Sequence, residues 1–156
     1  MDINLHKAFM EKALEEAKKA EKIGEVPIGA VIVKNEKIIA TGYNKRETHQ
    51  NALLHAEIEA INNACEKLGS WRLTDCNLYV TLEPCPMCAG AIINSRIKRL
   101  IFGAKDPKAG SCCSLINLFE LEYNHRPEII SGVMQDKCKS LLSGFFENLR
   151  KNNHSH

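Results

Sequence analysis

Two short motifs contain the residue types that could perform chemistry in this chain. The first is His55-Ala56-Glu57, and the second is Pro84-Cys85-Pro86-Met87-Cys88. Cys85 and Cys88 are three residues apart, so both sulfur atoms can face the same point from the first turn of a helix. One imidazole and two thiolates suit zinc, and three protein ligands leave a fourth position open for water. The spacing therefore predicts a catalytic site with one Zn²⁺ per subunit, held by His55, Cys85 and Cys88.

Glu57 is the residue that we expect to move protons at this site. Zinc lowers the pKa of a bound water towards roughly 7, and a general acid/base must lie within one hydrogen bond of that water. Glu57 is two residues from His55 and cannot point in the same direction. Both motifs are expected at helix N-termini, where unpaired backbone N–H groups favour thiolate over thiol.

Each motif also has an ordinary interpretation when it is considered alone. A single Cys-x-x-Cys could be a redox pair, and a single histidine is usually a core or surface residue. Together and in this order, the motifs match His-x-Glu…Pro-Cys-x-x-Cys, the signature of the zinc-dependent nucleobase deaminases. The combination therefore predicts a deaminase.

The remaining cysteines are not expected to form a second site of this kind. Cys65, Cys76 and Cys138 lie in or next to predicted helices and strands, where cysteine usually packs as a small apolar side chain. Cys112 and Cys113 form an adjacent pair in a predicted loop. A fourth ligand from this pair would close the zinc site and displace the water, which is the specific way in which the catalytic interpretation could fail.

Hydrophobic periodicity predicts the elements that must position the two motifs. The expected helices span 5–22, 55–67, 86–94, 114–120 and 135–150, and the expected strands span 26–33, 38–43, 77–82, 97–102 and 129–130. Strands separated by helices favour an α/β fold, a three-layer α/β/α arrangement around a five-stranded mixed and largely parallel sheet. We expect one domain over residues 1–150 and a flexible tail over 151–156.

Composition narrows the class of protein without identifying its partner. The chain has 156 residues and seven cysteines, with no apolar leader and no apolar run that approaches a membrane span. We therefore expect a cytoplasmic protein with reduced thiols. The net charge of +2 and pI of about 8.1 do not by themselves indicate nucleic-acid binding. Basic residues gather at 96–99, at Lys105 and Lys108, and at Lys137 and Lys139, where solvated surface is the simpler interpretation.

Beyond the two motifs, the chain resembles the bacterial tRNA-specific adenosine deaminases of the cytidine deaminase-like superfamily. The resemblance covers nearly the whole chain, and the loop around Asp106 and the terminal phenylalanine pair are specific to the tRNA-acting branch. The segments that carry it are Glu25–Val31, Gly42–Asn44, His55–Glu57, Thr81–Ala91, Phe102–Gly110, Asn124–Arg126 and Leu142–Phe146.

The resemblance implies roles for four further residues. Asn44 would hydrogen-bond the bound nucleoside, Val26 would form an apolar wall of the pocket, and Asp106 would lie near the nucleotide sugar. Phe146 would lie close to the flipped anticodon base. Each has an ordinary alternative: a strand core for Val26, a turn for Asn44, a helix cap for Asp106, and an anchor of the last helix for Phe146.

The activity implied by the resemblance is the conversion of the wobble adenosine of an arginine tRNA to inosine. Zinc-bound hydroxide would attack C6 of the base while Glu57 carries protons to the ring and to the departing amine. The expected partners are a tRNA anticodon stem-loop and a second copy of the chain in a homodimer, with no membrane and no organic cofactor.

The residue types and their spacing also permit three other functions. The same zinc motif could serve a deaminase of a free base or nucleoside, such as cytosine, cytidine or guanine. A zinc-stapled module could bind RNA without altering it, although such a module has no use for Glu57. Cys85 and Cys88 could also act as a thiol-disulfide pair.

Overall fold

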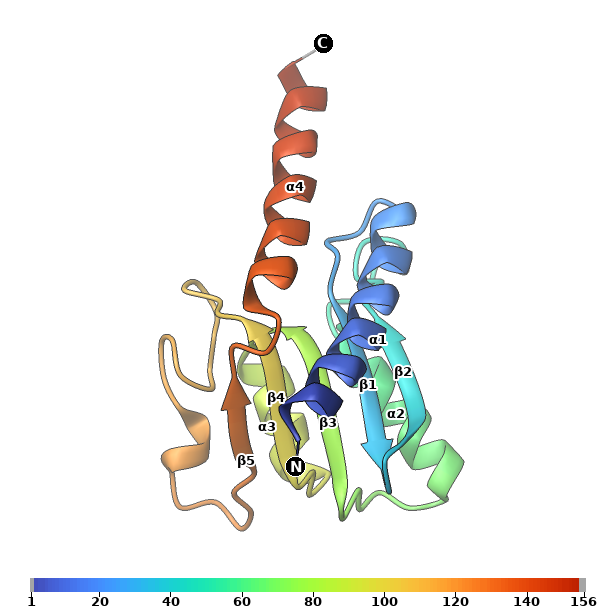
Figure 1. The fold of residues 1–156 in the computed structure, drawn as a ribbon, viewed down its shortest axis with the longest axis vertical. Coiled ribbons are helices and arrows are strands. Elements are labelled where there is room, and N and C mark those ends of the chain that lie inside the picture. Colours follow the sequence, from blue (N-terminus) through green and yellow to red (C-terminus); the bar gives the residue numbers. More distant parts are fainter. Residues whose placement is uncertain (1, 155–156) are drawn as a thin grey trace.

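A five-stranded sheet forms the centre of the protein, and the computed structural model describes residues 2–154. The strands lie in the order β2-β1-β3-β4-β5 (Figure 1). They span β1 (Gly29–Lys34), β2 (Lys37–Tyr43), β3 (Cys76–Leu82), β4 (Arg99–Ala104) and β5 (Glu128–Ser131). β1 is antiparallel to both β2 and β3, whereas the β3–β4 and β4–β5 pairs are parallel. The predicted mixed sheet is confirmed, but it is not largely parallel, because the β1–β2 hairpin supplies an antiparallel edge.

Helices cover both faces of this sheet, as expected for a three-layer fold. α1 (Ile3–Lys22) and α4 (Gln135–His154) pack on one face, and α2 (Ala56–Leu68) and α3 (Pro86–Asn94) pack on the other (Figure 1). Alternate residues of each strand serve the two layers, as in β4, where Ile101 faces α1 and Phe102 belongs to the core under α2 and α3. β2 and β3 run in the same direction, since both are antiparallel to β1. α2 follows β2 and α3 follows β3 on the same face of the sheet, so the N-termini of the two helices lie at the same end of the sheet.

Gly42 sets how closely α2 lies on the sheet. A Cβ atom at this position would lie 2.4 Å from the carbonyl oxygen of Ala56 and 2.6 Å from the backbone nitrogen of Ala60. Only glycine permits this approach, since real Cβ atoms do not come so near to backbone. The first turn of α2, which follows His55 and contains Glu57, is therefore seated directly against β2.

Two strand boundaries differ from the sequence-based expectation. β1 begins at Gly29 and not at Val26, because Pro27 has no N–H and the Val26 carbonyl accepts from the N–H of Ile28. β4 begins at Arg99 and not at Ile97, since the Ile97 N–H still bonds to Ile92 in the turn that ends α3. Val26 is thus outside the strand core, which removes the ordinary alternative for that residue.

The predicted helix over 114–120 is wrong. Only a single 3₁₀ turn forms there, η1 (Leu118–Glu120), and the preceding backbone is irregular. The reason is that the Leu115 and Leu118 N–H groups donate to the Gly110 and Ser111 carbonyls, so the Leu118 N–H is not available for the helical bond to Ser114. β5 nevertheless lies parallel to β4, as the prediction required.

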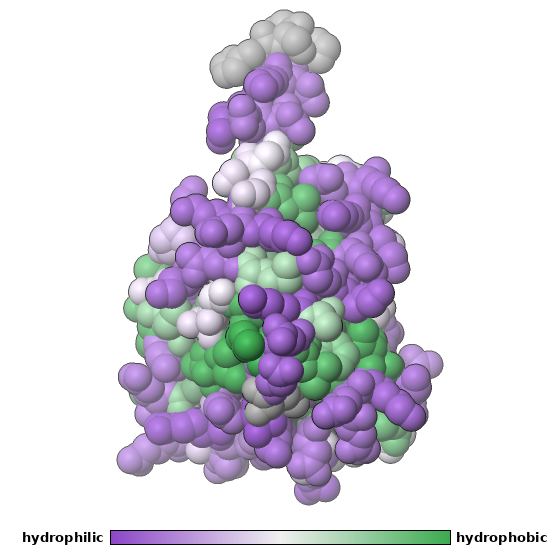
Figure 2. Space-filling view, viewed as in Figure 1, coloured by the Kyte–Doolittle hydropathy of each residue, from purple (hydrophilic) through white to green (hydrophobic). Residues whose placement is uncertain are grey.

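α4 is longer than predicted and stands out from the body of the molecule. It runs to His154 and not to Arg150, so most of the predicted tail is helical, and residues 155 and 156 lie outside the described residues. Its far end extends beyond the sheet (Figure 1), and hydrophilic residues cover it (Figure 2). Over residues 2–154, none of the helices has both the length and the apolar character needed to cross a membrane.

Candidate functional site

A pocket of about 480 Å³ opens at the carboxyl ends of β3 and β4. It brings together residues from both motifs and from four other segments of the chain. The residues that line it are Val26, Ile28, Asn44, Arg46, His55, Glu57, Leu82, Glu83, Cys85, Lys105, Asp106, Pro107, Lys108, Ala109, Leu142 and Phe146. Every predicted site residue except Cys88 is in this set, and Cys88 is fully buried behind Cys85. A pocket of this size suits a small organic ligand.

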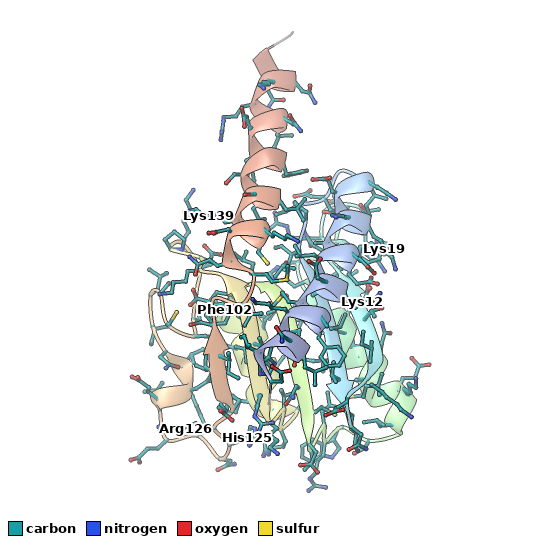
Figure 3. The ribbon with its side chains drawn as sticks, in the orientation of Figure 1. Lys12, Lys19, Phe102, His125, Arg126 and Lys139 are labelled. Atoms are coloured by element: carbon teal, nitrogen blue, oxygen red, sulfur yellow. The ribbon has the colours of Figure 1, made fainter. Side chains whose placement is uncertain are left out.

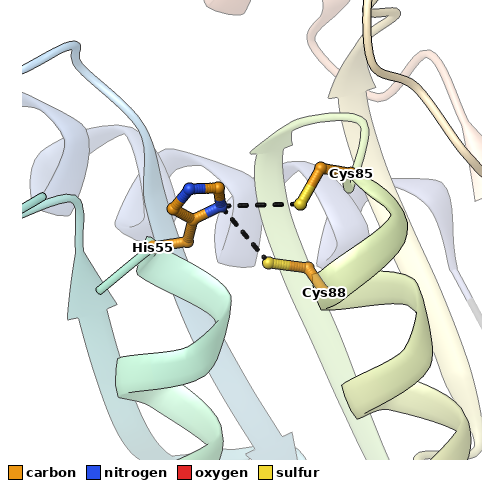
Figure 4. A group of neighbouring side chains, drawn as sticks. All are labelled: His55, Cys85 and Cys88. Carbon is orange, nitrogen blue, oxygen red and sulfur yellow. Dashed lines mark hydrogen bonds between the residues drawn. The ribbon is translucent and has the colours of Figure 1, made fainter. Parts of the chain in front are cut away.

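His55, Cys85 and Cys88 converge at the wall of this pocket (Figure 4). His55 is the N-cap residue of α2 and Cys85 is the N-cap residue of α3, so the two helix N-termini face one another. Pro86 occupies the first position of α3, where the missing N–H costs nothing. The ligand atoms of the three residues all lie within 4.8 Å of one another. The helix starts predicted from sequence therefore meet in space.

The separation of the three ligand atoms fits a tetrahedral zinc ion. The Nδ1 atom of His55 is 3.6 Å from the Cys85 sulfur and 3.5 Å from the Cys88 sulfur. Zinc bonds of ordinary length to nitrogen and sulfur, at a tetrahedral angle, put those two atoms about 3.6 Å apart. The donor set and its spacing thus both suit zinc. Among the described residues this cluster includes neither Cys112 nor Cys113, so the closed four-ligand arrangement is not formed.

Electrostatics at the cluster favour negative charge on the Cys85 sulfur. A hydrogen bond from Cys88 and the neighbouring His55 lower the pKa of the Cys85 thiol to about 4, although burial acts in the opposite direction. The hydrogen bond with Cys85 raises the pKa of His55. The hydrogen bond between Cys88 and Cys85, together with burial, raises the pKa of Cys88. Cys85 is therefore the anionic group of the cluster, and a bound cation would stabilise its thiolate further.

Glu57 lies beside this cluster without belonging to it. Its side chain is in the first turn of α2 and is 4% exposed, and it hydrogen-bonds to Cys88. Burial raises its pKa to about 7. A carboxyl group with that pKa can both accept and release a proton near neutral pH, which is the property of a general acid/base.

Asn44 and Val26 form one wall of the pocket together. The Asn44 side chain is buried, and its Nδ2 group donates to the Val26 carbonyl at 3.3 Å. Its Oδ1 atom accepts from the backbone N–H of Arg46 at 3.2 Å. Asn44 therefore shapes the turn after β2, as its ordinary interpretation requires, and it also lines the pocket. Each polar atom retains one hydrogen-bonding position.

Asp106 and Phe146 lie on the opposite side of the pocket. The Asp106 carboxylate accepts from the N–H groups of Lys108 and Ala109, so it caps a turn and not a helix. Phe146 is 41% exposed and packs edge-on against Phe145 with ring centroids 5.5 Å apart. That exposure does not fit a buried anchor of α4. Phe146 also borders an adjoining hollow with Lys108, Ser143 and Arg150.

Only one of the three basic groups noted in the sequence faces the pocket. Lys105 and Lys108 line it, and Arg46 joins them from the other wall. In contrast, Arg99 pairs with Glu128 at 2.8 Å, Lys137 pairs with Glu11, and Arg96 stacks over Trp71. His125 and Arg126 lie at the end of the molecule far from α4 (Figure 3), where they bond to the Ile97 and Glu120 carbonyls.

Sequence reasoning did not identify two buried carboxylates, Glu25 and Glu83. They are 1% and 2% exposed, respectively. Glu25 accepts from the N–H groups of Glu47 and Thr48, and Glu83 accepts from the loop after β4. For both residues burial raises the pKa, but the hydrogen bonds outweigh it, so each pKa lies below its ordinary value. In the sequence, both residues are acidic and lie next to an apolar strand. This pattern could have identified them, because a carboxylate buried beside a strand needs hydrogen-bond partners within the protein.

The hydrogen bonds of Glu25 should make it a pH-dependent contributor to stability. Because the folded-state pKa is depressed, the ionised carboxylate stabilises the fold above the ordinary value of 4.5, and this is lost as the pH falls through the folded-state pKa. We expect Glu25→Gln to lower the free energy of unfolding by about 2 kcal/mol at pH 7 and by much less at pH 3. Urea denaturation of both proteins at each pH measures the difference. An equal difference in the free energy of unfolding at both pH values would show that the ionised Glu25 carboxylate is not the source of the stabilisation.

Comparison with known proteins points to one group of enzymes. Residues 4–150 match the family model of the MafB19-like deaminases. The tRNA-specific adenosine deaminase of Bacillus subtilis (strain 168) is 54% identical over 144 residues, which cover 92% of this chain and 89% of that protein. A solved structure from work on A-to-I editing by tRNA deaminases at the wobble position is 45% identical, with a TM-score of 0.84 over 86% of this chain and 99% of that one. A guanine deaminase structure from Bacillus subtilis is 37% identical, with a TM-score of 0.63 over 81% and 79% of the two chains.

Proposed function

This chain belongs to the tRNA-specific adenosine deaminases within the MafB19-like deaminase family, and from that premise we propose that it converts the wobble adenosine of an arginine tRNA to inosine. The observation that carries the proposal is the composition of the pocket. One cavity contains the His55 and Cys85 ligand groups, a buried carboxylate, and polar, aromatic and basic residues beyond them. Such an arrangement is what a base-flipping deaminase requires.

We propose that His55, Cys85 and Cys88 hold one Zn²⁺ ion. The fit of their spacing to a tetrahedral ion supports this, as does the low pKa of Cys85. When bound, zinc would activate a water molecule for attack on the base. Three ligands from the chain leave one position free for that purpose.

Glu57 is the proposed proton carrier. Its position beside Cys88 and its pKa of about 7 support the role. The carboxylate accepts a proton from the attacking water and passes it to N1 of the adenine ring. It then helps to protonate the departing amine, so that inosine and ammonia are released. Burial keeps bulk water away from the carboxyl group during both transfers.

Asn44, Val26, Asp106 and Phe146 are the proposed contacts of the nucleotide. Asn44 has unused hydrogen-bonding positions on a pocket wall, and Val26 offers an apolar surface for the ring. Asp106 lines the same pocket, which supports a position near the sugar of the nucleotide. Phe146 offers an exposed aromatic face of the kind on which unpaired RNA bases stack.

The surroundings of the pocket favour RNA over a free base. Lys105, Lys108 and Arg46 at its rim can bind phosphate groups, and Arg150 lies beyond them in the adjoining hollow. A free nucleobase has no phosphate that would use these cations. The likeness to guanine deaminase nevertheless makes a free base the second candidate substrate.

A direct comparison of substrates tests the proposal. The zinc-loaded protein is incubated with an arginine-tRNA anticodon stem-loop that has a wobble adenosine, with free adenosine, with cytidine and with guanine. We expect inosine in the RNA and at least about 10²-fold slower turnover of the free compounds, because truncated substrates lose the binding energy of the remote contacts. Chromatography and mass spectrometry of the digested products measure each reaction. Turnover of guanine or cytidine alone would reject the tRNA assignment in favour of the second candidate.

We also propose that the chain acts as a cytoplasmic homodimer. Two adjacent apolar side chains on the surface support self-association: Leu115 is 63% exposed and Ile116 is 48% exposed. Light scattering at micromolar concentration distinguishes the dimer from a monomer, which would contradict the proposal.

A further inference from the structure

The side chain of Glu83 lies at the centre of the loop formed by residues 105–114. Glu83 directly follows β3 and is two residues before Cys85. Its backbone N–H donates to the Ala104 carbonyl at 2.8 Å, so its own position is tied to the end of β4. From this fixed point the carboxylate reaches into the 105–114 loop.

Both oxygen atoms of the Glu83 carboxylate are occupied by groups of that loop. Oε1 accepts from the Asp106 N–H at 3.0 Å and from the Ser114 hydroxyl. Oε2 accepts from the N–H groups of Cys112, Cys113 and Ser114, at 3.2, 2.9 and 2.9 Å. This ring of N–H donors is a typical anion-binding arrangement of irregular backbone. No acceptor position remains for a substrate, so Glu83 acts through the loop.

Gly110 shows how closely the loop encloses the carboxylate. A Cβ atom at Gly110 would lie 2.4 Å from the Glu83 carboxyl carbon and 2.5 Å from its Oε1 atom. The loop has no regular secondary structure of its own before the isolated bridge between Cys112 and Asn117. Its conformation therefore depends on hydrogen bonds to a side chain from another element.

The same loop carries the cations and the carboxylate that line one side of the pocket. Lys105, Asp106 and Lys108 all project from it, and the Asp106 N–H is itself one of the donors to Glu83. We propose that Glu83 is a positioning residue for RNA binding, which holds the 105–114 loop so that Lys105 and Lys108 meet the phosphates of the anticodon loop. This inference rests on the proposed function, because it assigns the lysines to RNA.

Glu83→Gln is the variant that tests the role most directly. It keeps the size of the side chain but replaces one oxygen by an NH₂ group, which then faces backbone donors in place of accepting from them. Because the displaced groups bind substrate and do not react, we expect KM for the stem-loop to rise by roughly 10- to 100-fold and kcat to change far less. Glu128→Gln, which removes an equal charge on β5, is the matched control.

The salt dependence of binding separates this role from a general loss of stability. Each phosphate contact to a single strand contributes about −0.7 to the slope of log affinity against log salt, so losing both lysine contacts should reduce the slope by about 1.4. Fluorescence anisotropy with a labelled stem-loop measures it. The double variant Lys105→Ala/Lys108→Ala should show the same reduction. Adding Glu83→Gln to that double variant should lower the affinity for the stem-loop little further, since all three changes act on the same lysine–phosphate contacts.

Several outcomes would overturn the inference while leaving the proposed function intact. If the wild-type protein deaminates the stem-loop but Glu83→Gln keeps its KM and its salt slope, Glu83 does not position the lysines. Loss of zinc in Glu83→Gln, measured by metal analysis, would assign the residue to the metal site instead. If Glu83→Gln does not fold, Ser114→Ala removes a single donor, and an unchanged KM in that variant also rejects the inference. If the wild type fails to deaminate the stem-loop, it is the proposed function that fails.

Discussion

Replacing Glu57 by alanine is expected to lower kcat by about 10²- to 10⁴-fold and to leave the zinc content unchanged. The side chain is the proposed proton carrier; it is buried at the pocket and does not belong to the ligand cluster. Its removal should abolish proton transfer to the ring and to the leaving amine without removing a metal ligand. Inosine formation in the stem-loop and metal analysis of the same sample measure the two effects.

Two further variants control for the loss of the side chain itself. Glu57→Gln keeps the volume but cannot take up a proton, so we expect it to be nearly as inactive as the alanine variant. Glu66→Gln changes an exposed residue on the same helix and should retain full activity. An unchanged rate of inosine formation in Glu57→Ala would show that another group carries the proton.

Replacing Cys88 by alanine is expected to remove both the metal and the activity. Two of the three donor atoms then remain, and zinc does not bind tightly to one imidazole and one thiolate in an otherwise open site. Loss of a residue that only orients a metal ligand lowers metal affinity by up to about 10²-fold, so loss of a ligand itself should lower zinc affinity by more than that. We expect deamination to become undetectable. Metal analysis after dialysis and the stem-loop assay measure these losses.

Cys76 provides a matched control for this experiment. It is fully buried like Cys88, but it lies at the start of β3, at the other end of the strand from the pocket. Cys76→Ala should lose packing and stability while retaining zinc. Full zinc occupancy in Cys88→Ala would show that the ligand set is different.

The residues of the proposed zinc site could be predicted from the sequence because their geometry is partly local. Cys85 and Cys88 lie on one helical turn, and Pro86 marks where that helix begins. His55 and Glu57 are likewise fixed relative to each other at the start of α2. Apart from the helix over 114–120, periodicity also predicted the order of strands and helices along the chain, and the fold class is confirmed.

The sequence patterns failed where the conformation depends on distant partners. The segment 114–120 has helical spacing, yet the Leu115 and Leu118 N–H groups bond to the Gly110 and Ser111 carbonyls, which lie before the segment. Val26 has strand propensity, yet its carbonyl is already used by Ile28 and by the Asn44 side chain. In both places a hydrogen bond from outside the segment outweighs the local preference.

By itself, then, the sequence predicted which residues carry the chemistry, and it determined which elements present them. Only the tertiary structure decided how the pocket around them is built. Glu25 holds the loop on one side and Glu83 holds the loop on the other, and neither contact follows a spacing rule. The physical reason is that a helix or strand repeats its contacts at a fixed interval, whereas a loop takes its shape from whatever satisfies its backbone N–H groups. Here that partner is a buried carboxylate from elsewhere in the chain.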